Sequence, residues 1–334
     1  MPTPPASVRE LVDRTLKGDR AALARAISWI ENEAPDAAAL QDACFTHSGR
    51  ARRLGVTGPP GAGKSTLITC LVRLYRRRGE TAAIVAVDPT SPFSGGALLG
   101  DRVRMGELAG DPGVFIRSMA TRGSLGGLAV HTAQVCDVLD AAGFSRILIE
   151  TVGVGQSELE VAQTAESTAV VLVPESGDGV QAMKAGLMEI GDLFVINKAD
   201  REGAERGAHA VRSALELRAR GNWDPPVLLT VASQGTGVEE VVEAFETHFA
   251  NLEGRGGLER RRRLGLEQLL NQLLRDRLWG AFRAQVPAGK WAEVLDDLVE
   301  RRLGPNQAAE RLIARPVAAE AARSIRPEPA PPRG

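Results

Sequence analysis

A glycine-rich stretch near the start of the chain has the residue types that bind phosphate. It reads G-P-P-G-A-G-K-S-T over residues 58–66 and leads from an apolar run into a helical pattern. Glycines let successive N–H groups converge on a phosphate, the lysine can reach the β and γ oxygens, and the serine hydroxyl can ligate Mg²⁺. A helix that begins here also directs its positive dipole end at the anion. The predicted triphosphate-binding residues are Gly58, Pro59, Pro60, Gly61, Ala62, Gly63, Lys64, Ser65 and Thr66.

A second motif, N-K-A-D at residues 197–200, indicates which base is bound. It directly follows an apolar run, and the carboxyl ends of strands are where α/β sheets bind ligands. The Asp200 carboxylate can accept both N1–H and the exocyclic N2–H₂ of guanine, a donor pair that adenine lacks, and the Lys198 stem can stack on the ring. The alternative is an Asx turn that caps a helix near Glu202. The predicted base contacts are Asn197, Lys198 and Asp200, with Ser233 and Gln234 from a less specific turn.

Carboxylates that follow two further apolar runs are candidates for binding Mg²⁺. Asp88 ends the run at residues 84–87, Glu150 ends the run at residues 147–149, and a loop rich in glycine and serine leads on to Asp101. Carboxylates beside a triphosphate complete the oxygen shell that Mg²⁺ prefers. Helix capping or loop solvation is the alternative for each of them. The predicted metal ligands are Ser65, Asp88, Asp101 and Glu150.

The elements that position these residues can be predicted from the apolar pattern. Short apolar runs alternate with helical segments, and each run is continuous instead of alternating with polar residues. Such runs are typical of strands buried on both faces, so we predict an α/β fold, a P-loop NTPase with a mostly parallel central sheet. The predicted strands are residues 53–57, 81–87, 114–116, 146–149, 169–173, 193–196 and 227–231.

Helical patterns flank the predicted sheet on both sides in the sequence. Residues 7–48 carry two apolar sets at helical spacing, each preceded by a serine or aspartate able to cap a helix. Residues 258–315 are helical again and include an apolar stripe that requires a partner surface, for which the chain's own GTPase domain is the alternative to a second copy. That stripe consists of Leu266, Leu270, Leu273, Leu274, Leu278 and Trp279.

Four segments are predicted from these patterns. Residues 1–50 form an N-terminal helical segment, and residues 51–255 form the P-loop GTPase domain. Residues 256–315 form a C-terminal helical arm, and the proline- and alanine-rich residues 316–334 are expected to be disordered.

Composition and charge exclude several classes of function. With 334 residues, 43% of them hydrophobic, and a net charge of −1, the chain offers no general attraction to nucleic acid or to a membrane surface. The arginine run at residues 260–263 is predicted to be a solvated helix face. Three distant cysteines, no signal pattern and no long apolar run predict a cytoplasmic protein. The isolated histidines, which with the cysteines form no metal site, are His47, His131, His209 and His248.

Five motifs in order resemble those of the MeaB-type GTPases, the chaperones of adenosylcobalamin-dependent methylmalonyl-CoA mutase. They are G-P-P-G-A-G-K-S-T, V-D-P-T-S, G-D-R-V-R-M, E-T-V-G-V-G-Q-S-E and N-K-A-D, and they span nearly the whole chain. The glutamate of E-T-V-G is typical of the wider metallochaperone-related group. The resemblance implies Mg²⁺-dependent hydrolysis of GTP to GDP, a homodimer formed through the C-terminal arm, and a mutase and its adenosyltransferase as partners.

The resemblance also implies a third switch, at residues 174–186, that links the nucleotide state to the mutase. The family's acidic, amide and basic positions match Asp178, Gln181 and Lys184, whereas Glu175 stands where the family usually has glycine. From the residues alone, Lys184 is an exposed helix lysine. The predicted partner switch therefore depends on the resemblance.

The group that activates water is left open. Gln156 lies two residues beyond the usual glutamine position, Asp88 or Asp101 are alternatives, and Arg104 and Arg122 lie in loops that can approach the site. We expect slow intrinsic hydrolysis that a partner accelerates by completing the site. The predicted catalytic residues are Lys64, Asp88, Asp101, Glu150, Gln156 and Lys184.

The expected function is that of a GTPase chaperone. It binds an adenosylcobalamin-dependent acyl-CoA mutase, with methylmalonyl-CoA mutase as the first candidate, and couples GTP hydrolysis to cofactor loading and protection. One alternative is a small-molecule kinase on the same phosphate loop, which requires an acceptor pocket and usually binds adenine. The other is a nickel-type metallochaperone GTPase, which requires clustered metal ligands.

Overall fold

The computed structural model describes most of the chain. The described residues are 5–88, 106–108, 110–120, 127–151, 164–174, 186–218 and 222–313. They divide between two compact units, Met1–Leu269 and Leu270–Gly334. The predicted disordered tail, residues 316–334, lies outside the described residues.

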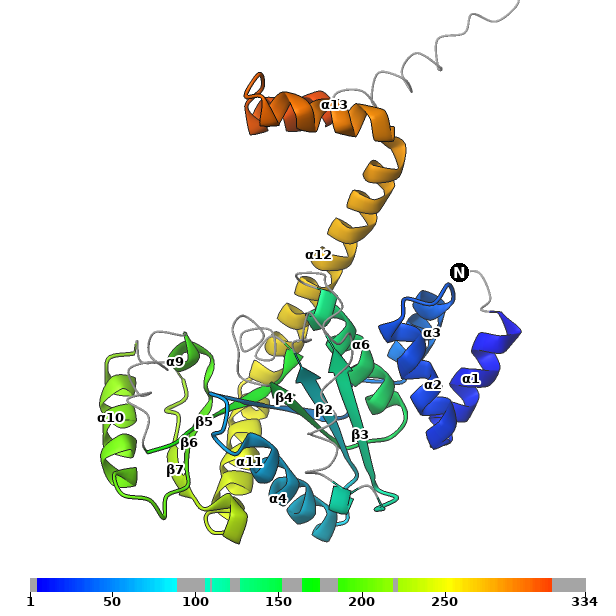
Figure 1. Ribbon diagram of the computed structural model, residues 1–334. Helices are drawn as coiled ribbons and strands as arrows, with labels where there is room; N and C mark the ends of the chain where they lie inside the picture. Colours follow the sequence, from blue (N-terminus) through cyan, green and yellow to red (C-terminus); the bar gives the residue numbers. More distant parts are fainter. Residues whose placement is uncertain are drawn as a thin grey trace, which may run out of the picture. The chain divides into compact units, whose positions relative to one another are not determined.

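Seven parallel strands form one sheet in the order β3-β2-β4-β1-β5-β6-β7 (Figure 1). This confirms the predicted α/β fold with a mostly parallel sheet. Strands β4, β5 and β6 are buried at every residue, which explains why residues 147–149, 169–172 and 193–196 are continuous apolar runs instead of alternating with polar residues. The strands are β1 Arg52–Thr57, β2 Ala82–Asp88, β3 Val114–Ala120, β4 Arg146–Thr151, β5 Ser167–Leu172, β6 Leu193–Asn197 and β7 Val227–Thr230.

Strand β3 is longer than predicted. The prediction ended it at Ile116, because Arg117 and Ser118 interrupt the apolar run. In the structure the guanidinium Nε of Arg117 donates to Glu31 at 2.9 Å, so a helix that covers the sheet edge supplies the missing partner. The polar residues therefore continue the strand.

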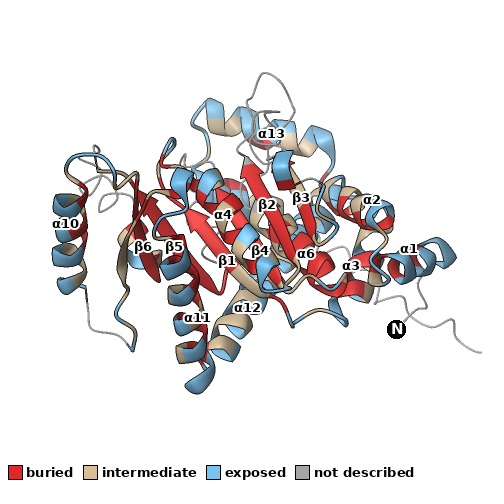
Figure 2. Ribbon diagram, turned by 90° about the horizontal axis from the view of Figure 1, so that it is seen from below, coloured by how far each residue is buried: buried red, intermediate tan, exposed pale blue. Residues whose placement is uncertain are grey.

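Helices cover both faces of the sheet. One face packs against α4 (Lys64–Arg77) and α11 (Val238–Gly254), and the other against α6 (Gly127–Ala141) and α10 (Ala204–Glu216). Figure 2 shows the strands buried and the exposed residues on the outer sides of these helices. Short elements complete the described fold: α9 Leu187–Ile190 and the 3₁₀ turns η1 Gly106–Leu108 and η2 Ala232–Gln234.

Three N-terminal helices pack beside α6: α1 (Ala6–Leu16), α2 (Arg20–Glu31) and α3 (Ala37–Phe45). Asp19 caps α2 as predicted, because its carboxylate accepts from the N–H groups of residues 21 and 22 at 2.9 and 3.1 Å. The predicted serine cap of α1 is wrong, since Ser7 lies inside the helix. The helix begins after Pro5, whose carbonyl accepts from the N–H groups of Val8 and Arg9 in the first turn, both at 3.1 Å.

The second unit is helical. It contains the C-terminal half of α12 (Gly257–Gln285), then α13 (Ala288–Val299), and residues 305–313 are also helical. The helices within the predicted helical region 258–315 are interrupted twice: before Ala288, where Pro287 has no N–H to continue the ladder, and after Val299, where Arg301 has a φ of 57°. The ring centroids of Trp279 and Trp291 lie 6.0 Å apart. Among the helices described, none is long and apolar enough to cross a bilayer.

Candidate functional site

The phosphate loop, residues 58–66, requires glycine at two positions where it packs against neighbouring strands. Gly58 has a φ of +134°, and a Cβ added there would lie 2.0 Å from the carbonyl oxygen of Val171 in β5. Gly63 has a φ of +88°, and its Cβ would lie 2.3 Å from the side-chain nitrogen of Asn197. Gly61, with a φ of +76°, has no atom within 4 Å of such a Cβ. The path of the loop is therefore set by contacts with β5 and β6.

The structure places three of the predicted site residues, Lys64, Ser65 and Glu150, at the carboxyl edge of the sheet. The Lys64 ammonium is buried and donates to the carbonyls of Gly58 and Pro59 at 2.7 and 2.9 Å. The Ser65 hydroxyl donates to Oε1 of Glu150 at 2.6 Å. Glu150 belongs to β4, which lies beside β1, so parallel pairing places it next to the loop. The sequence separation between Ser65 and Glu150 is 85 residues.

These oxygens fit the chemistry of Mg²⁺. The ion is held in proteins by one or two carboxylates, a hydroxyl, water and substrate phosphates. Ser65 and Glu150 supply a hydroxyl and a carboxylate in contact, and Asp88 ends β2, the strand on the other side of β4. Only the backbone of Asp88 is described. The donor set fits magnesium better than a soft metal, which prefers sulfur and nitrogen.

Asn197 joins three segments of the site. Its Nδ2 donates to the carbonyl of Ala62 in the phosphate loop at 2.8 Å. Its Oδ1 accepts from the Thr230 hydroxyl at 3.0 Å and from the N–H of Ala232 at 3.1 Å. The side chain is buried, at 3% exposure. Asn197 therefore fixes the phosphate loop relative to η2, on which Ser233 and Gln234 are exposed.

The two residues predicted to contact the base lie in the turn after β6. Lys198 has a φ of 59°, in the left-handed region that residues other than glycine seldom adopt. Asp200 is exposed. Helix α10 begins at Ala204 after Gly203, and no side chain caps it. The residue that directly precedes α10 is therefore a glycine and not Asp200.

Five predicted site residues lie outside the described residues, and so do three further residues that the sequence singled out. The first group is Asp101, Gln156, Asp178, Gln181 and Lys184, and the second is Arg104, Arg122 and Glu175.

The prediction that residues 260–263 form a solvated face is wrong for two of the arginines. Arg261 Nη2 lies 2.6 Å from Asp192 Oδ1, and Arg262 Nε lies 2.5 Å from Glu166 Oε1. Glu166 directly precedes β5 and Asp192 directly precedes β6, so both carboxylates lie at the amino edge of the sheet. These arginines therefore fasten the start of α12 to two strands.

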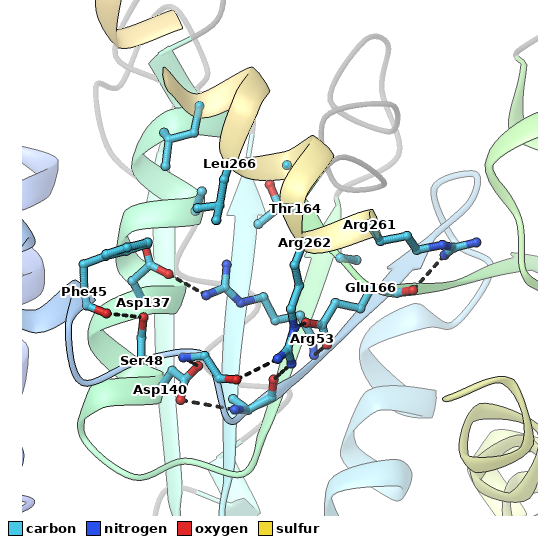
Figure 3. A pocket seen from close by; sticks show the side chains of 16 residues that line it. Phe45, Ser48, Arg53, Asp137, Asp140, Thr164, Glu166, Arg261, Arg262 and Leu266 are labelled. Carbon is cyan, nitrogen blue, oxygen red and sulfur yellow. Dashed lines mark hydrogen bonds and ion pairs between the residues drawn. The ribbon is translucent and has the colours of Figure 1, made fainter. Parts of the chain in front are cut away.

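The carboxylate of Glu166 also belongs to a pocket at this amino edge (Figure 3). Arg53, at the start of β1, donates to Asp137 of α6 at 2.6 Å, and Gln41 donates to the same carboxylate at 2.8 Å. Burial raises the pKa of Asp137 against the opposing effect of Arg53 and Gln41. Because its charged groups pair with one another and the phosphate loop leaves the opposite end of β1, this pocket is separate from the nucleotide site.

The cysteines and histidines do not supply a metal site among the described residues. Within those parts of the chain, no group of three His, Cys, Asp or Glu side chains is arranged to hold an ion. Burial raises the pKa of Cys44 to about 11 and that of Cys136 to about 12. Both thiols are therefore protonated at neutral pH, and a protonated thiol is a poor metal ligand.

Replacing Gly58 by alanine is expected to reduce nucleotide hydrolysis by about 100-fold, because displacement of the reacting groups by about 1 Å has effects of this size. The added Cβ would meet a backbone oxygen of Val171, which cannot move without distorting β5. Turnover at saturating nucleotide measures the effect. Gly61→Ala is the matched control, because it has a similarly positive φ and open space around it. Equal losses of hydrolysis in the two variants would show that backbone strain alone, and not the contact with β5, determines the path of the loop.

Comparisons with known proteins give consistent results. The profile of the family described as methylmalonyl Co-A mutase-associated GTPase MeaB matches residues 23–286. A putative GTPase of Pyrococcus abyssi is 44% identical over 310 residues, which cover 92% of this chain and 96% of that protein. The Caenorhabditis elegans protein named methylmalonic aciduria type A homolog, mitochondrial, is 32% identical over 328 residues, with 92% and 82% covered.

A solved structure agrees with these sequence matches. The crystal structure of an LAO/AO transport system kinase superposes with a TM-score of 0.72 at 29% identity, covering 93% of this chain and 98% of that one. The profile match begins within α2 and ends one residue after α12, so it includes every strand of the sheet.

Proposed function

Because the chain belongs to the MeaB family of methylmalonyl-CoA mutase-associated GTPases, we propose that it uses GTP hydrolysis to load and protect the adenosylcobalamin of an acyl-CoA mutase. Methylmalonyl-CoA mutase is the first candidate partner. The hydrolysis of GTP follows from membership of the family, and the observation that carries the proposed partner is the profile match over residues 23–286.

The residues of the phosphate loop bind and orient the triphosphate in this proposal. Backbone N–H groups of the loop surround the β-phosphate, and the Lys64 ammonium donates to the β and γ oxygens. Ser65, Glu150 and Asp88 hold Mg²⁺, with Asp101 as a further candidate. When bound, Mg²⁺ neutralises charge that develops on the phosphate oxygens. The partly buried contact of Ser65 with Glu150 at 2.6 Å supports this arrangement.

Guanine is bound in the turn after β6. The Asp200 carboxylate accepts the two adjacent N–H donors of the base, and the stem of Lys198 covers one face of the ring. Asn197 holds this turn, the phosphate loop and η2 at a fixed separation through the three hydrogen bonds described above. Triphosphate and base are thereby bound by one rigid frame. Within it the Asp200 carboxylate favours guanine nucleotides over adenine nucleotides.

The assembly is also part of the proposal. A homodimer forms through the C-terminal helical arm, predicted at residues 256–315, and a cytoplasmic mutase with its adenosyltransferase completes the set of partners. Exposed apolar side chains in the second unit support an interface on the arm, because isolated large apolar patches seldom face water. The most exposed of them on α12 are Leu270, Leu274, Leu278 and Trp279, at 57%, 47%, 68% and 56%.

The Lys184→Ala variant tests whether the nucleotide state is coupled to a mutase. Lys184 lies outside the motifs that bind phosphate and base, and its predicted part in catalysis is to transmit the effect of the mutase, so we expect basal GTP hydrolysis close to that of the wild type. Acceleration by the mutase, for which coupling of about 5- to 150-fold is typical, is expected to disappear. The measurement is GTP turnover with and without apo-mutase, together with transfer of adenosylcobalamin.

Lys17→Ala is the control, since Lys17 is an exposed lysine at the end of α1. Equal acceleration of the wild type and Lys184→Ala would remove the assignment of a third switch. If no cobalamin-dependent mutase accelerates the wild type or receives cofactor from it, the proposed function is wrong.

A further inference from the structure

Two buried threonines meet where the phosphate loop and the metal-binding strand separate. The hydroxyl oxygens of Thr57 and Thr151 lie 2.9 Å apart, and both side chains are 0% exposed. Thr57 is the last residue of β1 and directly precedes Gly58 of the phosphate loop. Thr151 is the last residue of β4 and directly follows Glu150. The hydrogen bond therefore joins the two segments that supply the proposed Mg²⁺ site.

This bond lies beyond the backbone pairing of the two strands. The ladder between β1 and β4 ends where Val56 faces Glu150. One residue later Thr57 pairs through its backbone with β5, and Thr151 pairs with β2. The described backbones of β1 and β4 thus begin to part at this level, and the two hydroxyls span the separation.

The phosphate loop and the end of β4 are connected on both faces of the sheet. Side chains alternate along a strand, so Glu150 points toward α4 and Thr151 points toward α6. Their neighbours agree, because Leu148 packs in the core under α4 and Ile149 packs in the core under α6. Ser65 and Glu150 are in contact on the first face, at 2.6 Å, and the threonines are in contact on the second.

We propose that Thr57 and Thr151 are positioning residues for Mg²⁺, and the proposal rests on the metal site of the proposed function. Their bond fixes the distance between the phosphate loop and Glu150. Mg²⁺ requires nearly ideal octahedral geometry at about 2.0–2.1 Å, so a small separation of the two segments weakens its binding. Neither threonine contacts the nucleotide or the ion, because both face the other side of the sheet.

The test is the Mg²⁺ dependence of nucleotide retention, which does not depend on hydrolysis. Release of a fluorescent GDP analogue is measured over a range of Mg²⁺ concentrations for Thr57→Val, Thr151→Val and the double variant. Valine keeps the shape of threonine and removes the hydroxyl. We expect the Mg²⁺ concentration for half-maximal retention to rise about 10- to 100-fold, as for other residues that hold metal ligands in place. GDP affinity without Mg²⁺ is expected to match that of the wild type, because neither hydroxyl contacts the nucleotide.

The double variant separates positioning from stability. Each single variant leaves one buried hydroxyl without its partner and lowers the melting temperature, whereas the double variant leaves none and regains most of the loss. Its Mg²⁺ requirement is expected to stay raised. Thr57→Ser and Thr151→Ser keep a hydroxyl and are expected to restore a wild-type requirement.

Thr15→Val is the matched control for the loss of a buried threonine hydroxyl. The Thr15 side chain is 0% exposed and donates to the carbonyl of Leu11 within α1, at 2.8 Å. We expect this variant to lose stability and to keep the wild-type Mg²⁺ requirement. An unchanged requirement in the double variant would overturn the proposal and make the threonine pair a structural contact only. A wild type whose retention of GDP is independent of Mg²⁺ would instead overturn the metal site itself.

Discussion

GTP hydrolysis by Lys64→Ala is expected to fall at least about 1,000-fold, which corresponds to about 4 kcal/mol of lost transition-state stabilisation. The ammonium lies in the phosphate loop, where it contacts the carbonyls of Gly58 and Pro59, and 5% of the residue is exposed. A positive charge held in such an environment acts on the phosphate oxygens with little competition from water. Its removal leaves the charge that develops in the transition state without its nearest partner.

The measurement is single-turnover hydrolysis of GTP with enzyme in excess, together with the melting temperature of the variant. Lys290→Ala is the control, because Lys290 lies on α13 and pairs with Glu293 at 3.2 Å. A Lys64→Ala protein that melts like the wild type and hydrolyses GTP at the wild-type rate would show that the turnover belongs to a contaminant.

Asp200→Asn is expected to invert the preference between guanine and xanthine nucleotides. The carboxylate accepts from two N–H groups of guanine, whereas an asparagine amide can donate to the carbonyl that xanthine has in place of the amino group. Sites that hydrogen-bond a group of the substrate reject analogues that cannot make the same bonds by about 10⁴-fold, and we expect a total change of this order in the affinity ratio of GTP to XTP. Affinities from competition with fluorescent GDP measure the change.

The surface variant Asp42→Asn controls for the loss of one carboxylate, since Asp42 is exposed on α3. It is expected to keep the wild-type ratio. Equal affinities of the wild type for ATP and GTP would show that Asp200 does not select the base.

The elements of the fold were predictable because their signals are local. The buried strands β4, β5 and β6 contain continuous apolar runs, and the Asp19 cap lies next to the helix that it caps. The predicted end of β3 was wrong because a residue distant in the sequence pairs with a polar residue of the strand. Arg117 interrupts an apolar run in the sequence, yet Glu31 of α2 pairs with it and the strand continues.

In the candidate site, too, residues in local motifs were predictable, and contacts between residues distant in the sequence were not. The motif around Lys64 and the position of Glu150 at a strand end were readable, since parallel strands bring their carboxyl ends to one edge. The pairing of Arg262 with Glu166 joins residues 96 positions apart, and charges carry no periodicity that reveals such a partner. The contact between Thr57 and Thr151 also left no signal, because threonine is common in strands for steric reasons alone.

The pairing of Arg261 and Arg262 with carboxylates at the amino ends of β5 and β6 limits where the C-terminal arm can be exchanged for that of a relative. Asp192 and Glu166 are 7% and 5% exposed, and a buried carboxylate that loses its cation is strongly destabilising. Residues 257–269 therefore belong structurally to the nucleotide-binding unit, which ends at Leu269. We expect gene fusions and exchanges of the arm between relatives to be tolerated when the junction follows Leu269, because no buried carboxylate of the sheet then loses its arginine.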